Sequence, residues 1–110
     1  MKRKYRLRRS ADFQAVRDER KGAGNDVLRV QVKSNAAGHP RIGIVVTKRL
    51  GGAVVRNRVR RQLQAAARES VISLAAFDVV VRPRQAAVSV SAGALRASLA
   101  QALLASGAQQ

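Results

Sequence analysis

Residues 53 to 71 constrain the fold most, because apolar and cationic side chains recur there at the period of a helix. One stripe is apolar and spans roughly 80° of a helical wheel; its members are Val55, Val59, Leu63 and Ala66. The remaining arc is polar and mostly guanidinium; it consists of Arg56, Asn57, Arg58, Arg60, Arg61, Gln64 and Arg68. Such a helix buries one narrow face against a partner and presents the other face outwards.

Three other segments have strand patterns. Residues 28 to 33 alternate apolar and polar side chains, whereas residues 42 to 46 form a continuous run typical of a more central strand. The turn-forming segment 34 to 40 predicts that these two strands form a hairpin. A third strand is expected at residues 77 to 82 and ends at Pro83. A further short strand fits near residues 22 to 26.

Two more helices complete the expected order. The first covers residues 10 to 21, with Ser10 as its cap. The last is capped by Ser89 or Ser91 and carries a buried stripe at Leu95, Leu99, Ala102 and Leu103. We expect one α+β domain over residues 1–110, in the order α-β-β-α-β-α, with a mixed sheet of three to four strands. Residues 1–9 form a basic arm, and residues 105–110 a frayed tail.

The charge of the chain predicts a polyanionic partner. The 110 residues include 22 Lys and Arg but only 6 Asp and Glu, which gives a formal net charge of +16. Arginine predominates, and its planar fork suits phosphate oxygens. The bulky apolar face that a membrane partner would require is missing. We therefore expect a nucleic-acid partner, no membrane partner and no obligate protein partner.

Composition also bounds the cellular setting. The chain has no cysteine, so it has no disulfide framework and no thiolate metal site. The basic start leads into charged residues and not into the apolar core of a signal peptide, and no stretch approaches the ~20 apolar residues of a membrane span. A cytoplasmic protein is expected.

The acidic residues and the single histidine are too scattered to predict a catalytic site. A protein nuclease needs carboxylates gathered around metal ions, or a histidine with an acid–base partner. We interpret Asp78 as pointing outwards from its strand, and His39, beside Pro40 in a turn, as a surface residue. Neither catalytic nor metal-binding side chains are therefore expected in this chain.

Gly51 and Gly52, directly before the basic helix, have two interpretations. They form a tight strand-to-helix turn, or they also leave the helix amides free to hold a phosphate together with Lys48 and Arg49. The sequence does not decide between these two.

The block from Lys48 to Arg61, KRLGGAVVRNRVRR, strongly resembles the signature of the bacterial ribonuclease P protein family. The resemblance extends over nearly the whole chain, through LRRSADF at residues 7 to 13 and DVVVR at residues 78 to 82. It implies a left-handed β-α-β crossover around the basic helix, an exception to the usual hand. It also implies that a catalytic RNA, with bound Mg²⁺, removes the 5′ leader of precursor tRNA with the help of this protein.

The resemblance assigns two surfaces. The contacts to the catalytic RNA are assigned to the basic helix and the basic residues before it, and we add Arg68, the last arginine of that helix. The candidates are therefore Lys48, Arg49, Arg56, Asn57, Arg58, Arg60, Arg61 and Arg68. The single-stranded leader would lie in a cleft between the first helix and the sheet, and the candidates there are Arg9, Phe13, Arg17 and Arg29. Such clefts combine cations with an aromatic platform.

This chain departs from the family pattern at two positions. Arg17 stands where the family often has a second aromatic residue, and Gln64 where a further arginine is usual. Compared with the family pattern, we therefore expect this cleft to stack on fewer bases and to make more contacts to phosphate. Phe13 is either part of this cleft or a core residue of the first helix. A structural RNA-binding protein of the ribosomal type is the alternative function, since the charge supports it equally well.

Overall fold

The basic segment forms helix α2, Ala53–Ser70, in the computed structural model, which describes residues 2–108. Its expected stripe is confirmed at Val59, Leu63 and Ala66, which are buried, while Val55 is partly buried. The helix starts at Ala53, two residues after Gly51, whose φ of 142° favours a residue without a Cβ. It is followed by a 3₁₀ turn, Val71–Ser73.

The sheet has four strands, and their order corrects two predictions. The strands are β1 (Gly22–Gly24), β2 (Leu28–Ser34), β3 (Arg41–Ile44) and β4 (Phe77–Pro83), in the order β1-β2-β4-β3. The predicted hairpin of β2 with β3 is wrong, because β4 lies between them, antiparallel to β2 and parallel to β3. The predicted central strand, β3, is the edge strand. The short strand β1 is confirmed.

The burial of β4 explains why it takes the central place. Val79 and Val81 belong to the main core on one face, whereas Val80 belongs to a smaller cluster on the other face. A strand that is buried on both faces is stabilised most between two neighbours. The connection β3-α2-β4 joins parallel strands, as the resemblance implies; its left-handed sense stays a prediction.

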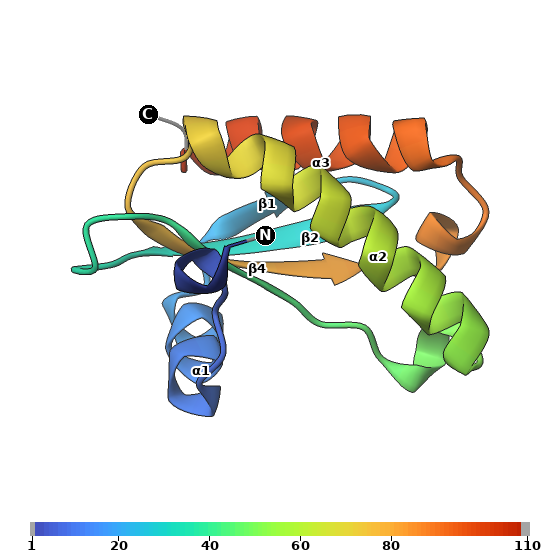
Figure 1. The fold of residues 1–110 in the computed structure, drawn as a ribbon, viewed down its shortest axis with the longest axis horizontal. Coiled ribbons are helices and arrows are strands. Elements are labelled where there is room, and N and C mark those ends of the chain that lie inside the picture. Colours follow the sequence, from blue (N-terminus) through green and yellow to red (C-terminus); the bar gives the residue numbers. More distant parts are fainter. Residues whose placement is uncertain (1, 109–110) are drawn as a thin grey trace.

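The helices cover the sheet unequally (Figure 1). α2 and α3 (Ala92–Ser106) lie together over one face, and α1 (Ser10–Glu19) lies alone over the other. The main core fills the two-helix side and includes the expected stripe of α3. The α1 side has only a small core of Leu7, Val16 and Val80, with Phe13 and Val45 packed against it. Much of that sheet face is therefore left for polar side chains.

The helix ends refine the sequence predictions. Ser10 is the first residue of α1 and caps nothing, and the helix ends at Glu19 because Arg20 adopts a left-handed conformation, with φ of 56°. Of the two predicted caps of α3, Ser91 is the correct one, since its Oγ accepts a hydrogen bond from the amide of Ala94 at 3.1 Å. No helix within residues 2–108 is long and apolar enough to cross a membrane.

Both terminal segments pack more closely than predicted. Leu7 is buried and its amide donates to the carbonyl of Ile42 at 3.0 Å, so the basic arm runs along the free edge of β3. At the other end, Ala108 is buried and its carbonyl accepts from the amide of Ala75 at 2.8 Å. The expected fraying from residue 105 is thus wrong as far as residue 108, and residues 109–110 lie outside the described residues.

Candidate nucleic-acid interface

The first basic surface is the N-terminal half of α2 with the 3₁₀ helix before it, Lys48–Leu50. We call it the arginine face. Its members are Lys48, Arg49, Arg56, Asn57, Arg58, Arg60 and Arg61; the first two belong to the 3₁₀ helix and the other five to the first three turns of α2. Arg56 and Arg60 are partly buried, and the other members are exposed.

Hydrogen bonds hold three of these arginines in place without a carboxylate. Asn57 accepts at its Oδ1 from Arg60 Nη1, at 3.1 Å, and at its carbonyl from Arg61 Nε, at 3.4 Å. Arg58 Nη2 donates to the carbonyl of Val88 at 2.8 Å. Neutral acceptors orient a guanidinium and leave its charge uncompensated, so the face remains strongly attractive to phosphate.

Arg68 is separated from the arginine face. It lies seven residues after Arg61, the last member of that face, which at 1.5 Å per residue is about 10 Å along the axis. It lines a hollow with the N-terminal segment and residues of the β2–β3 loop. The predicted set for the catalytic RNA therefore divides into two groups in space.

The second basic surface lies on the α1 side of the sheet. Strand register places Arg29 of β2 directly opposite Arg82 of β4. Arg17 of α1 lies near enough to Arg82 for its charge to affect it. The side chain of Arg84 lies beside Gly24 of β1, because its Nη2 would be 3.4 Å from a Cβ added to that glycine. We call these four arginines, Arg17, Arg29, Arg82 and Arg84, the sheet cluster. Like charges opposite one another destabilise a sheet, so this arrangement favours an external anion.

Arg82 is the member of the sheet cluster most affected by its surroundings. Partial burial lowers the pKa of its guanidinium, and the charge of Arg17 lowers it further. Its Nε donates to Oε1 of Gln31 at 2.8 Å, which orients the group across the sheet. A bound phosphate would relieve both destabilising effects.

The predicted cleft residues do not all meet at this cluster. Arg17 and Arg29 belong to it, whereas the exposed Arg9 lines a hollow beside the N-terminal segment. Phe13 is partly buried, and its ring packs over Gly43 so closely that a Cβ there would overlap it. The ring therefore serves as a core residue with part of its surface still exposed. Sequence reasoning did not identify Arg82 and Arg84, because which residues they oppose depends on strand register.

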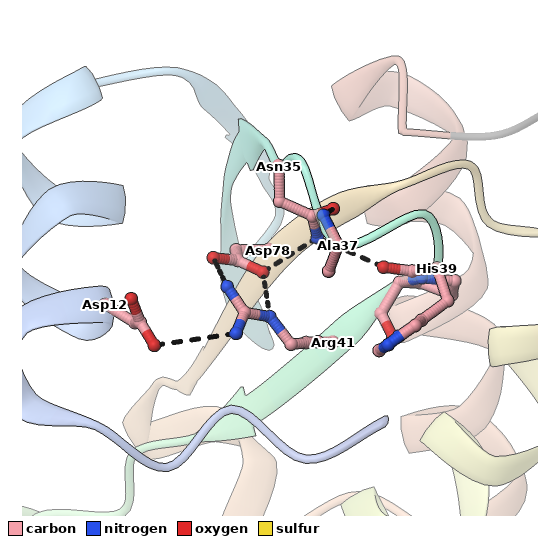
Figure 2. A network of polar contacts seen from close by, with 7 residues as sticks. Asp12, Asn35, Ala37, His39, Arg41 and Asp78 are labelled. Atoms are coloured by element: carbon pink, nitrogen blue, oxygen red, sulfur yellow. Dashed lines mark hydrogen bonds and ion pairs between the residues drawn. The ribbon is translucent and has the colours of Figure 1, made fainter. Parts of the chain in front are cut away.

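A buried ion network joins α1 to the sheet (Figure 2). Asp78 is 5% exposed and accepts two hydrogen bonds from Arg41, both at 2.7 Å, and one from Asn35 at 2.9 Å. Asp12 of α1 adds an ion pair to Arg41 at 3.6 Å. The prediction that Asp78 points outwards into solvent is wrong: alternation gave the correct face, but Arg41, Asn35 and α1 cover it.

The network also accounts for the charge state of Arg41. Its hydrogen bonds to Asp78 raise the pKa of the guanidinium, against the opposing effect of burial. A raised pKa stabilises the fold at every pH below the unfolded value, and the contribution is lost only when pH rises through the folded value, in strongly alkaline solution. The charged guanidinium of Arg41 thus joins β3 to Asp78 of β4 and to Asp12 of α1.

His39 is partly buried and not the free surface residue predicted. Its ring meets that of Tyr5 in a T-shaped contact, with centroids 5.7 Å apart. Within residues 2–108, no three side chains among His, Cys, Asp and Glu are gathered so that they could hold a metal ion. The remaining paired acids are Glu19, with Lys21, and Glu69, with Arg96.

Fold and surface together define a small α+β protein that presents separate arginine clusters to a polyanion. Residues 1–106 match the family model described as Ribonuclease P. The ribonuclease P protein component of Acidothermus cellulolyticus is 45% identical over 98 residues, covering 86% of this chain and 81% of that relative. That of a Staphylococcus epidermidis strain is 34% identical over 104 residues, covering 94% and 90%. The chain belongs to the ribonuclease P protein family.

Solved structures agree with this membership. The ribonuclease P protein of Staphylococcus aureus superposes with a TM-score of 0.89 at 29% identity, covering 96% of this chain and 98% of that one. The protein from Thermotoga maritima gives 0.80 at 30% identity, covering 87% and 94%. The chain is thus a component of a tRNA-processing ribonucleoprotein endoribonuclease, whose RNA is its partner.

Proposed function

We propose that the arginine face binds the catalytic RNA and that the sheet cluster receives the single-stranded 5′ leader of precursor tRNA. The protein thereby promotes removal of the leader, while RNA-bound Mg²⁺ supplies the hydrolytic chemistry. The observation that carries this proposal is the presence of two arginine clusters on opposite faces of the sheet, one on α2 and one beneath α1. Two clusters so placed can hold two RNA segments at once.

The side chains of the sheet cluster favour phosphate over base recognition. The cluster consists of four guanidinium groups, whereas the ring of Phe13, on the same side of the sheet, is partly buried against Gly43. Arginine contacts to phosphate carry no sequence information directly, whereas stacking needs an accessible ring. We therefore expect leader binding that depends steeply on salt and weakly on leader sequence.

A hollow on the same side of the sheet, next to the Asp12–Arg41–Asp78 network, gives the leader a path. It has a volume of about 500 Å³ and lies between α1 and the sheet, lined by Ala15 and Lys33 among others. Arg29, Gln31 and Lys33 follow one another at every second position of β2 and therefore lie on the same face of the sheet. A single strand that enters here would pass along a row of donors towards Arg82.

Cleavage of a 5′-labelled precursor tRNA at low Mg²⁺ tests the proposal. The three arms contain this protein alone, a bacterial ribonuclease P RNA alone, and both together. Efficient cutting at the mature 5′ end only in the mixture is the expected result. A protein that binds RNA without changing cleavage would instead be a structural RNA-binding protein, and cutting by the protein alone would identify a self-sufficient nuclease.

Two variants separate the two surfaces. Arg82→Gln keeps a donor beside Gln31 but removes the charge, so affinity for precursor tRNA should fall while assembly with the RNA is unchanged. Arg61→Ala should weaken assembly and leave the affinity of the assembled enzyme for the leader unchanged. Equal effects of both variants on both affinities would refute the assignment of separate surfaces.

A further inference from the structure

A third candidate binding site is the hollow lined by Arg68, which lies outside the arginine face and the sheet cluster. It has a volume of about 640 Å³ and lies between the N-terminal 3₁₀ helix (Arg3–Tyr5), the β2–β3 loop and the C-terminal end of α2. Ligand pockets in proteins commonly measure ~300–1,000 Å³, so the hollow is large enough for a small aromatic ligand with its charged groups. Arg68, which the fold separates from the arginine face, lines it.

One wall of this hollow is an aromatic corner. The rings of Tyr5 and His39 meet at an interplanar angle of 83°, with centroids 5.7 Å apart. Tyr5 also packs against the main core, which fixes its ring from behind. Opposite lies an apolar surface that includes buried Val71 and the 81% exposed side chain of Ile72. A flat, partly apolar ligand fits such walls.

The rim of the hollow is cationic. Lys2, Lys4 and Arg68 line it, and no acidic residue does. Lys4 Nζ lies over the face of the Tyr5 ring, 5.0 Å from its centre, in a cation–π contact that a base stacking on this face would replace. A ligand that places a ring in the corner would therefore bring its anionic groups within reach of this lysine.

A second cationic hollow continues from the first. Its volume is about 310 Å³, and Lys4 and His39 line both hollows. The added lining is rich in arginine: Arg3, Arg6, Arg8, Arg9 and Arg41. Its one acid, Asp12, is paired with Arg41 at 3.6 Å. The two hollows form a basic track along the N-terminal segment that reaches the start of α1.

We propose that this track binds single-stranded RNA, with one base in the Tyr5–His39 corner and its neighbouring phosphates on Lys2, Lys4 and Arg68. Aromatic rings beside closely spaced cations are the features that hold single-stranded nucleic acid, because every base has a stacking face. A membrane surface would need several exposed bulky apolar side chains, and Ile72 is the one large exposed apolar residue of this lining. The RNA is either the catalytic RNA or the leader, and the chemistry of the site is the same for both.

Photocrosslinking in the assembled holoenzyme tests the site and identifies the RNA. Ile72→p-benzoylphenylalanine places the probe on an exposed side chain, so folding is preserved. In one arm the leader of precursor tRNA is labelled, and in the other the catalytic RNA. A crosslink to either RNA supports the site and names its occupant. The same probe in place of Arg61 is the control for assembly through the arginine face.

The control separates failure of this inference from failure of the proposed function. If the probe at position 61 crosslinks the catalytic RNA and the probe at position 72 crosslinks neither RNA, the third site does not exist. If neither probe crosslinks, both proposals are wrong. Crosslinking from position 72 to a protein alone would identify an acidic protein partner and overturn the RNA assignment.

Paired variants test the chemistry of the corner. Tyr5→Leu keeps an apolar side chain against the core and removes the ring, so affinity for the crosslinked RNA should fall by about tenfold. Tyr5→Phe keeps the ring and should stay within about twofold of the unsubstituted protein. Lys4→Gln should weaken binding by about threefold and flatten its salt dependence. Lys21→Gln removes one remote cation and should change neither.

Thermal unfolding of each variant checks that a loss of affinity is not a loss of fold. Equal affinities of Tyr5→Leu and Tyr5→Phe, with both proteins folded, would overturn stacking in the corner. If Tyr5→Leu does not fold, the Lys4→Gln and Lys21→Gln pair decides: equal salt slopes for these two variants would show that no phosphate lies on this rim.

Discussion

Gly43 of β3 provides the sharpest test of how α1 is seated on the sheet. A Cβ there would overlap Cζ of Phe13 and would lie 2.5 Å from its Cε1 and 3.2 Å from Cβ of Leu7. Non-bonded carbon atoms pack at about 3.5–4.0 Å, so in Gly43→Ala the ring must retreat by about 1 Å. The ring packs against the small buried cluster beneath α1 and cannot retreat alone. We expect a loss of about 2 kcal/mol in the free energy of unfolding.

The coupling between position 43 and the Phe13 ring is measured by denaturant unfolding. Gly43→Ala is introduced into two backgrounds, one with Phe13 and one with Phe13→Ala. The cost of the added methyl group should largely disappear once the ring is removed. Affinity for precursor tRNA should fall because α1 shifts, while assembly with the catalytic RNA should persist because α2 lies on the other face of the sheet. An equal cost of Gly43→Ala in both backgrounds would refute the proposed overlap.

Four further predictions concern single arginines. Arg41→Ala leaves buried Asp78 without its main partner and should lower the free energy of unfolding by about 3 kcal/mol, measured by denaturant titration. Arg58→Ala should cost about 1 kcal/mol of stability as well as RNA affinity, because its guanidinium also holds a backbone carbonyl. Arg61→Ala should lower RNA affinity and flatten the log-log salt slope by about one unit without loss of stability; an unchanged slope would show no phosphate contact. Arg17→Ala should raise the melting temperature, since it relieves repulsion in the sheet cluster, and should weaken binding of precursor tRNA; a lower melting temperature would contradict this.

The helices could be predicted well because their signals are local. The stripe of Val59, Leu63 and Ala66 and the cap at Ser91 depend on spacing within a few residues, and the structure confirms both. The arginine face follows from the same spacing, since side chains three and four apart on a helix share a side. A helical wheel gives the angle around the axis but not the neighbours at each end, so it could not show that Arg68 lines a hollow with the N-terminal segment.

The order of the strands could not be predicted from pattern alone. Residues 28 to 34 and 41 to 44 are adjacent in the sequence and separated by a turn, which favours a hairpin, but β4 pairs with both. One signal was available, because Val79, Val80 and Val81 form the continuous apolar run of a strand buried on both faces. The run at residues 42 to 46 gave the same signal, yet β3 lies at the edge, with Arg6 bridging to Ile42 along its free side.

Patterns along the chain were enough to predict a basic α+β protein, the positions of its main helices and the residues of the arginine face. Charge, helical period and the KRLGGAVVRNRVRR block are all readable along the chain. The folded structure was needed to show that Asp78 is buried, that Arg29 opposes Arg82, and that Tyr5 meets His39 near Arg68. Those contacts join residues far apart in the sequence, and they depend on strand register and helix docking, which local periodicity does not encode.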